Sequence, residues 1–190
     1  PHTGSDPIFM LAPILTAIYA IPSRRVNPLY PAVVSLGQVS GGAVSNVIPN
    51  EVLLRGTIRS LLPEVREQLL VDVENALRLT EHMGGGYKLN ILKGYPAMIN
   101  DPEANGWMRA VAADLLGEGV VRERPFGMGA EDFAYMTQRG KGAMFMLGAC
   151  VPEGPPRHHH TSTFDIDESV LAPGAAVLAE TARRFVTGRL

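Results

Sequence analysis

Three consecutive histidines stand where they could bind a metal ion. They occupy positions 158–160 of the stretch GPPRHHHTSTFDIDE, which begins at Gly154 and ends at Glu168. Imidazole nitrogens beside carboxylates are common ligands of zinc-like ions. Spacing alone leaves two alternatives: an exposed polar loop, and a ligand loop held rigid between a strand and the last helix. A purification tag fits less well, because the run is short and internal.

A second candidate is the stretch FGMGAEDFAYM at positions 126–136. Its two glycines allow close approach of a backbone, and Glu131 and Asp132 then open a short helix, where acidic groups suit the helix dipole. A structural role, capping the start of that helix, would explain the two carboxylates equally well. The functional alternative is a loop that lines a polar cleft and directs Glu131 or Asp132 toward a cation or its water.

The third candidate combines an asparagine with an arginine. Asn46 lies in a glycine-rich connection, and Arg59 follows thirteen residues later near the end of a mostly uncharged strand. An arginine can offer two parallel hydrogen bonds to a carboxylate, and an asparagine can donate to a carbonyl. The alternative is an edge-strand arginine in solvent and an asparagine that forms a turn.

Composition narrows the class of protein. The chain has 190 residues, 46% of them hydrophobic, which is enough for a sizeable core. Seventeen basic and nineteen acidic residues nearly balance, and without a basic cluster we expect neither nucleic acid nor a membrane surface as a partner. The single cysteine, Cys150, excludes an intrachain disulfide, so we expect a cytoplasmic protein. The apolar run Ile8–Ile21 contains Pro13 and is short for a membrane span, so no anchor or signal peptide is expected.

The elements that would position these residues form two groups. In the first group, capping and periodicity predict a helix from Pro7 to Pro22, strands over 32–40 and 50–60, a helix from Pro63 to the glycines at 84–86, and a strand over 87–94. This αββαβ order is a ferredoxin-like βαββαβ layer that lacks its first strand. The predicted class is α/β, and the first domain spans residues 1–97.

The second group would form a second domain over residues 98–190. Asp101 and Pro102 predict a capped helix that ends at Gly117, and a terminal helix is expected over 168–186. Short strands are expected over 120–124 and 142–148, with the loop of Glu131 and the histidine loop between them. The few strands suggest the C-terminal portion of a longer protein.

Taken in order, the blocks PHTGSDPI, SRRVNPLYPAVVSLGQVSGGAVSNVIPNEVLLRGTIRS, YPAMINDP, MGAEDFAY, LGA and HTSTFDIDE resemble one family over the whole chain. It is the amidohydrolase branch of the aminoacylase/carboxypeptidase G metallopeptidases, which includes hippurate hydrolases, N-acyl-amino-acid amidohydrolases and auxin-conjugate hydrolases. The resemblance implies a dimerising lid over residues 1–97 and the last part of a metal-dependent catalytic domain over residues 98–190. The lid would make a homodimer.

The resemblance also assigns roles. It selects His160, rather than His158 or His159, as a metal ligand, although the family usually has proline where this chain has Ser162. Asn46 and Arg59 match lid residues that contact the substrate, often across the dimer interface. Gly129, Glu131 and Asp132 match a site-lining block.

The implied activity is cleavage of the amide bond of N-acyl amino acids by water activated on two divalent metals, with zinc, manganese or cobalt as candidates. The general base and the other ligands would lie upstream of Pro1, so no catalytic residue is expected in this chain. One alternative is a dimerisation and scaffold fragment that is catalytically inactive by itself. A second alternative is a histidine-loop metal-binding module unrelated to hydrolysis.

Overall fold

The computed structural model describes residues 1–123 and 127–190. The chain divides into two compact units: Pro1–Ala97 with Gly127–Glu131, and Met98–Phe126 with Asp132–Leu190. Each unit has its own packing and is described by itself.

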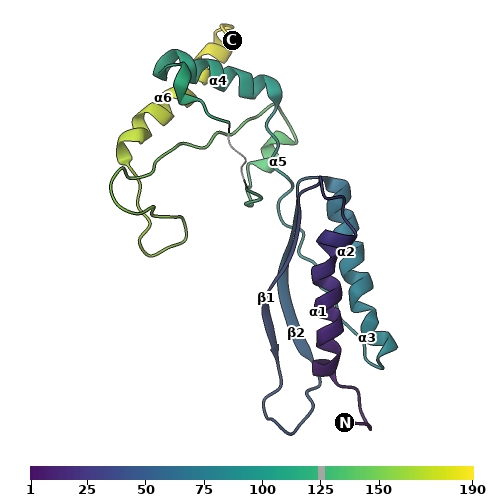
Figure 1. Cartoon of the computed structure of the whole chain (residues 1–190). Helices are drawn as coiled ribbons and strands as arrows, with labels where there is room; N and C mark the ends of the chain where they lie inside the picture. Colours follow the sequence, from purple (N-terminus) through teal and green to yellow (C-terminus); the bar gives the residue numbers. More distant parts are fainter. Residues whose placement is uncertain (124–126) are drawn as a thin grey trace. The chain divides into compact units, whose positions relative to one another are not determined.

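The first unit packs two helices on one face of a β-hairpin. Figure 1 shows α1 (Pro7–Arg24) and α2 (Pro63–Leu77) side by side along β1 (Ala32–Gly41) and β2 (Val52–Ser60). A short helix, α3 (Leu79–His82), follows α2. The core lies between helices and hairpin, and its buried members are Met10, Ile14, Ile18, Ile21, Val26, Val34, Val65, Leu69, Val73 and Ala76.

Helix α1 begins as the sequence predicts but ends later. The Asp6 carboxylate accepts hydrogen bonds from the backbone N–H groups of Ile8, at 2.9 Å, and Phe9, at 3.2 Å. The helix continues past Pro22 to Arg24, so the predicted end at that proline is wrong. Proline removes a single ladder hydrogen bond there, and buried Ile21 holds the last turn against the core.

The length and composition of α1 would also suit a membrane span, since its 18 residues have a mean hydropathy of 1.3. The core helix of a soluble protein passes the same test, and so does a signal sequence near the N-terminus. Four residues of α1 belong to the buried cluster of the first unit: Met10, Ile14, Ile18 and Ile21. This face of α1 therefore packs in the core of the first unit against the hairpin and α2.

A half-buried ion pair ties the end of α1 to α2. Asp72 is buried, and its Oδ1 accepts hydrogen bonds from Nε and Nη2 of Arg25, both at 3.3 Å. Gln68 donates to the backbone oxygen of Arg25 at 2.6 Å and to Oδ2 of Asp72 at 3.4 Å. These bonds satisfy a carboxylate that would be costly to bury alone.

The hairpin is antiparallel, and its register decides which side chains face outward. Val33 pairs with Arg59 and Val34 with Ile58, and the register shifts between Leu36 and Gln38. Side chains alternate across a strand, so Ile58 packs on the core while Arg59 lies on the outer face.

The strand predicted over 87–94 is absent from the sheet, which contains only β1 and β2 among the described residues. The segment runs without a turn or bend beside α2. Arg66 on α2 donates to the backbone oxygens of Gly94 and Tyr95, each at 3.2 Å, and Tyr87 Oη bonds Oε1 of Glu74 at 3.0 Å. The segment 87–94 has the alternating apolar pattern of a strand. It forms no strand because a strand also needs a neighbouring strand to hydrogen-bond with.

The second unit is helical. It contains α4 (Pro102–Leu116), a 3₁₀ turn η1 (Glu118–Val120), α5 (Ala134–Thr137), a second 3₁₀ turn η2 (Glu168–Val170) and α6 (Leu171–Val186). The predicted ends of α4 are confirmed: Asp101 accepts from the N–H groups of Glu103 and Ala104, and Gly117 has a φ of 96°. The terminal helix is also confirmed.

Neither strand predicted for the second unit is formed by the described residues. Val120 lies in η1, 121–123 have no regular structure, and Arg124 is outside the described residues. The segment 142–148 runs straight, without a turn or bend, but has no ladder partner. As with segment 87–94 of the first unit, apolar sequence alone does not make a strand without a neighbouring strand to hydrogen-bond with.

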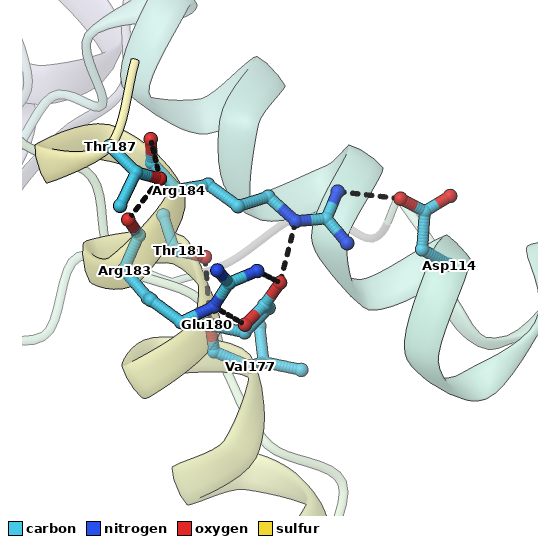
Figure 2. A network of polar contacts seen from close by, with 7 residues as sticks. All are labelled: Asp114, Val177, Glu180, Thr181, Arg183, Arg184 and Thr187. Atoms are coloured by element: carbon cyan, nitrogen blue, oxygen red, sulfur yellow. Dashed lines mark hydrogen bonds and ion pairs between the residues drawn. The ribbon is translucent and has the colours of Figure 1, made fainter. Parts of the chain in front are cut away.

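A network of charges fastens α6 to α4 (Figure 2). Arg184 donates from Nε to Oε1 of Glu180, at 2.9 Å, and from Nη1 to Oδ2 of Asp114, at 2.6 Å. Arg183 adds two hydrogen bonds to Glu180, at 2.6 and 2.7 Å. These hydrogen bonds lower the pKa of Glu180 from 4.5 to about 2, and Arg183 contributes more to the shift than Arg184.

Candidate functional site

Arg59 lies on the outer face of the hairpin and is exposed. Its Nη1 donates to the backbone oxygen of Met128, at 2.7 Å, in the Gly127–Glu131 part of the same unit. No other hydrogen bond involves its guanidinium in the described part of the chain. The Nε and Nη2 edge therefore remains available for two parallel hydrogen bonds to a carboxylate.

Asn46 is exposed in the connection between β1 and β2, at the opposite end of the hairpin from Arg59. Arg59 lies seven positions beyond Val52, the first residue of β2. At a rise of about 3.3 Å per residue, the two ends of β2 are about 23 Å apart. Within one chain, the hairpin keeps these two predicted substrate contacts apart.

The predicted site-lining residues differ in exposure. Gly129 and Asp132 are exposed, whereas Glu131 is half-buried. The backbone oxygen of Asp132 accepts from the N–H of Tyr135, at 3.0 Å, just before α5. Asp132 belongs to the second unit and Gly129 and Glu131 to the first, so the predicted block spans the division between the units.

The histidine loop is exposed and closed by local contacts. Arg157 forms an ion pair with Asp165, and the hydroxyl of Thr161 donates to the backbone oxygen of His158 at 2.8 Å. The ring of His159 packs on that of Phe164, with centroids 5.1 Å apart. The spacing between histidine and phenylalanine thus places His159, rather than His160, against the aromatic ring.

His160 has an unusual backbone. Its φ of 63° is the only positive φ of a non-glycine residue among the residues described. This left-handed conformation costs an L-residue about 1–2 kcal/mol, and such outliers concentrate at functional sites. His160 therefore differs physically from the two histidines before it.

Beyond the histidine loop, the chain is anchored at the start of η2. The N–H of Asp167 donates to the backbone oxygen of Ala149, at 3.0 Å. The carboxylate of Asp167 accepts from the N–H of Ser169, also at 3.0 Å, and this hydrogen bonding lowers the pKa of Asp167. The carboxylate thus acts as a helix cap in this structure.

The donor groups of the described chain do not by themselves make a metal site. No group of three or more His, Cys, Asp or Glu side chains converges in residues 1–123 and 127–190. His160 offers one imidazole, whereas a stable zinc-like site needs three or four protein ligands. A metal centre would therefore need donors in addition to His160.

A small hollow of about 130 Å³ lies at the turn from β2 to α2, lined by Ser60, Leu61, Leu62, Pro63, Arg66, Glu67 and Ala97. It contains none of the predicted site residues. Arg66 uses its guanidinium on two backbone oxygens, as described above. The hollow is too small for a typical small-molecule ligand.

The chain belongs to the peptidase family M20/M25/M40, whose model matches residues 11–184. It is 35% identical over 188 residues to a Synechocystis protein named as a hydrolase, sll0100, with 97% of this chain and 48% of the relative covered. It is 33% identical over 190 residues to N-acetyl-L-cysteine deacetylase of Bacillus subtilis, with 98% and 44% covered. The resemblance read from the sequence is thereby confirmed.

Solved structures agree with the α/β class. A Staphylococcus aureus protein named as an aminohydrolase superposes with a TM-score of 0.82 at 27% identity, covering 95% of this chain and 46% of the other. The YXEP protein of Bacillus subtilis, described as a dinuclear metal-binding peptidase of the M20 family, gives 0.73 at 25% identity, covering 94% and 46%. The chain therefore spans about half the length of the proteins it matches.

Sequence reasoning missed the partner of Arg59. The Met128 carbonyl lies 69 positions away in the chain, and carbonyl groups carry no sequence signal. Gly127 and Gly129 on either side were the available hint, since glycine permits close backbone approach. The role of Asn100, described below, also has no sequence signature beyond its position before a helix cap.

Proposed function

We propose that the protein takes part in cleaving the amide bond of N-acyl amino acids. Water adds across this bond and releases a carboxylic acid and the free amino acid. Family membership supports hydrolysis, and the relative named N-acetyl-L-cysteine deacetylase supports an N-acyl amino acid as the substrate class. The observation that carries the substrate class is the exposed Arg59 guanidinium, with one edge held by Met128 and the other edge available.

Arg59 would bind the carboxylate of the amino-acid part through Nε and Nη2. The Met128 carbonyl occupies only Nη1, so it would orient the guanidinium plane without competing for that edge. Two parallel hydrogen bonds fix direction as well as distance, and this places the scissile amide at a defined distance from the carboxylate.

Asn46 would donate its side-chain amide to a carbonyl of the substrate. Because β2 separates it from Arg59 by about 23 Å, one small substrate cannot contact both residues of the same chain. We propose that they come from two copies in a homodimer formed by the first unit. The sheet supports this, since in residues 1–123 and 127–190 it contains only β1 and β2, and both strands are edge strands that a second copy could pair with.

Divalent metal ions would be required, with zinc, manganese or cobalt as candidates and His160 as one ligand. A metal-binding relative of the family supports this expectation. Because the described donors do not make a complete site, the contribution assigned to this chain is substrate binding and one imidazole. We place this chemistry in the cytoplasm, where a single exposed cysteine, Cys150, would stay reduced.

The test is an assay of the protein that carries this sequence against N-acetyl and N-benzoyl amino acids, with each of the three metals. Arg59→Lys should raise KM at least tenfold for substrates with a free carboxylate and much less for their amides. Arg55→Lys is the matched control, since Arg55 lies on the same strand and outer face. Equal KM values for both variants would remove Arg59 from the substrate site. No hydrolysis of any N-acyl amino acid would contradict the proposed activity and favour the scaffold alternative.

A further inference from the structure

Strand β1 has a free edge that its own sequence does not protect. Within residues 1–123 and 127–190 the sheet contains only β1 and β2, so the side of β1 away from β2 has no neighbouring strand. The ten residues of β1, AVVSLGQVSG, include no charged side chain and no proline, which commonly keep such an edge from pairing with another chain. Two copies of this strand can therefore approach each other without charge repulsion.

The side chain of Tyr19, on α1, is bonded to this edge. Its hydroxyl donates a hydrogen bond to the backbone oxygen of Leu36 and accepts one from the N–H of Leu36, each at 3.3 Å. In an antiparallel pair, the backbone groups of successive residues point alternately toward the partner strand and away from it. Because both backbone groups of Leu36 are bonded to Tyr19, Leu36 is a residue whose backbone points away from β2. One hydroxyl thus takes the donor and the acceptor that a further strand would use.

Leu36 lies at the middle of β1, which runs from Ala32 to Gly41. Identical chains commonly associate around a two-fold axis, with the same surface used on both copies. If two β1 strands paired antiparallel along their whole length, that axis would pass beside the middle of the strand. The hairpin register also shifts here, between Leu36 and Gln38, and such a bulge twists the strand locally. Tyr19 is therefore bonded to the backbone groups that full-length pairing between copies would need.

The contact between Tyr19 and Leu36 is one that can be released. Both distances are longer than the usual hydrogen-bond range of about 2.7–3.2 Å, so the two bonds are weak. Tyr19 is 50% exposed, whereas Ile18 and Ile21 on the packed side of α1 are buried. A rotation of the tyrosine side chain would place its hydroxyl in water, where it keeps a hydrogen-bond partner.

We propose that Tyr19 is a latch that controls self-association through the β1 edge. While its hydroxyl is bonded to Leu36, a second copy has no access to the backbone at the middle of the strand. When the hydroxyl turns to solvent, the β1 strands of two copies can pair along their whole length. The occupant of the edge is a second copy, because the uncharged strand matches itself. The latch rests on the homodimer proposed above and adds what limits its formation.

The test measures the self-association of the 190-residue chain by analytical ultracentrifugation over a wide range of concentrations. Tyr19→Phe keeps the ring and removes the hydroxyl. It should lower the dissociation constant of the dimer at least about tenfold, because strand pairing no longer competes with the two bonds to Leu36. Tyr30→Phe is the matched control, since it removes a hydroxyl from another exposed tyrosine of the same unit and should leave the constant unchanged.

Hydrogen exchange locates the effect in the strand. At concentrations where the chain is a single copy, the N–H of Leu36 should exchange at least about tenfold faster in Tyr19→Phe than in the unmodified chain. Concentrating the variant should slow this exchange again, because a second strand then bonds the same amide. The amide of Thr57, which pairs with Ser35 inside the hairpin, should be unchanged and shows that the variant is folded.

Equal dissociation constants for Tyr19→Phe and the unmodified chain would overturn the latch and leave the homodimer standing. Equal exchange of the Leu36 amide in the two dilute proteins would also overturn it, because the hydroxyl would then not hold this amide. Tighter association that leaves the Leu36 amide exchanging fast would assign the dimer to another surface. A Tyr19→Phe chain that stays monomeric at every concentration would overturn the latch together with pairing through β1, whereas hydrolysis of N-acyl amino acids is tested separately.

Discussion

A Cβ placed on Gly56 would lie 2.2 Å from the backbone oxygen of Ser35 on the neighbouring strand. No side-chain movement can relieve such a contact, because the atom it meets belongs to the backbone. Gly56→Ala should therefore push β1 away from β2 and lower the free energy of unfolding by about 1–3 kcal/mol. Urea unfolding followed by circular dichroism measures this.

Gly37 provides the matched control within the same hairpin. A Cβ there would meet no atom within 4 Å. Gly37→Ala should change the free energy of unfolding by less than about 0.5 kcal/mol. Similar losses for the two alanine variants would mean that the close approach at Gly56 does not determine the strand spacing.

The next prediction concerns Asn100, whose amide replaces a strand partner for Met144. Asn100→Ala leaves the N–H and C=O of Met144 to water or unpaired, and should lower the free energy of unfolding by about 1–3 kcal/mol. Asn90→Ala, at an exposed position, is the control and should be near neutral. An Asn100→Ala variant as stable as the control would show that the two hydrogen bonds contribute nothing measurable.

The Glu180 network predicts how stability depends on pH. Arg183 and Arg184 lower the pKa of Glu180 from 4.5 to about 2 in the folded chain. The folded state therefore binds this proton more weakly than the unfolded state, so acid favours unfolding. The contribution is complete above pH 4.5 and is lost as the pH falls toward 2. The thermal midpoint should decrease over this range.

Glu180→Gln tests the source of that decrease, because the amide keeps the shape of the side chain but cannot titrate. The midpoint of this variant should be lower than that of the unmodified chain at pH 6, and should change less between pH 4.5 and pH 2. Glu153→Gln, at an exposed loop position, should follow the unmodified chain. Parallel curves for all three proteins would assign the acid sensitivity to other carboxylates.

Local signals in the sequence predicted the elements that depend on local bonds. Asp101 caps α4 and Gly117 ends it, because capping needs only residues a few positions apart. The segments 87–94 and 142–148 failed as strands for the opposite reason. Their alternation or apolar character is correct, but pairing requires a partner that local sequence does not specify.

The candidate site was predictable as residue types and less so as geometry. Arg59 could be placed on the outer face of a strand from alternation alone, whereas its bond to Met128 joins positions 69 residues apart. The left-handed backbone of His160 could not be anticipated, since the three histidines are chemically identical and only their loop geometry distinguishes them.

The separation of Asn46 from Arg59 allows a decisive test of the shared site. Asn46→Ala and Arg59→Ala should each abolish most of the activity when every copy carries the change. If each site takes Asn46 from one copy and Arg59 from the other, co-expression of the two variants restores it. A mixed dimer has one site with both natural residues, and half of randomly paired dimers are mixed, so about a quarter of the sites should be active. Activity no greater than that of the separate variants would place both contacts in one copy. The hairpin would then have to change conformation to bring Asn46 close to Arg59.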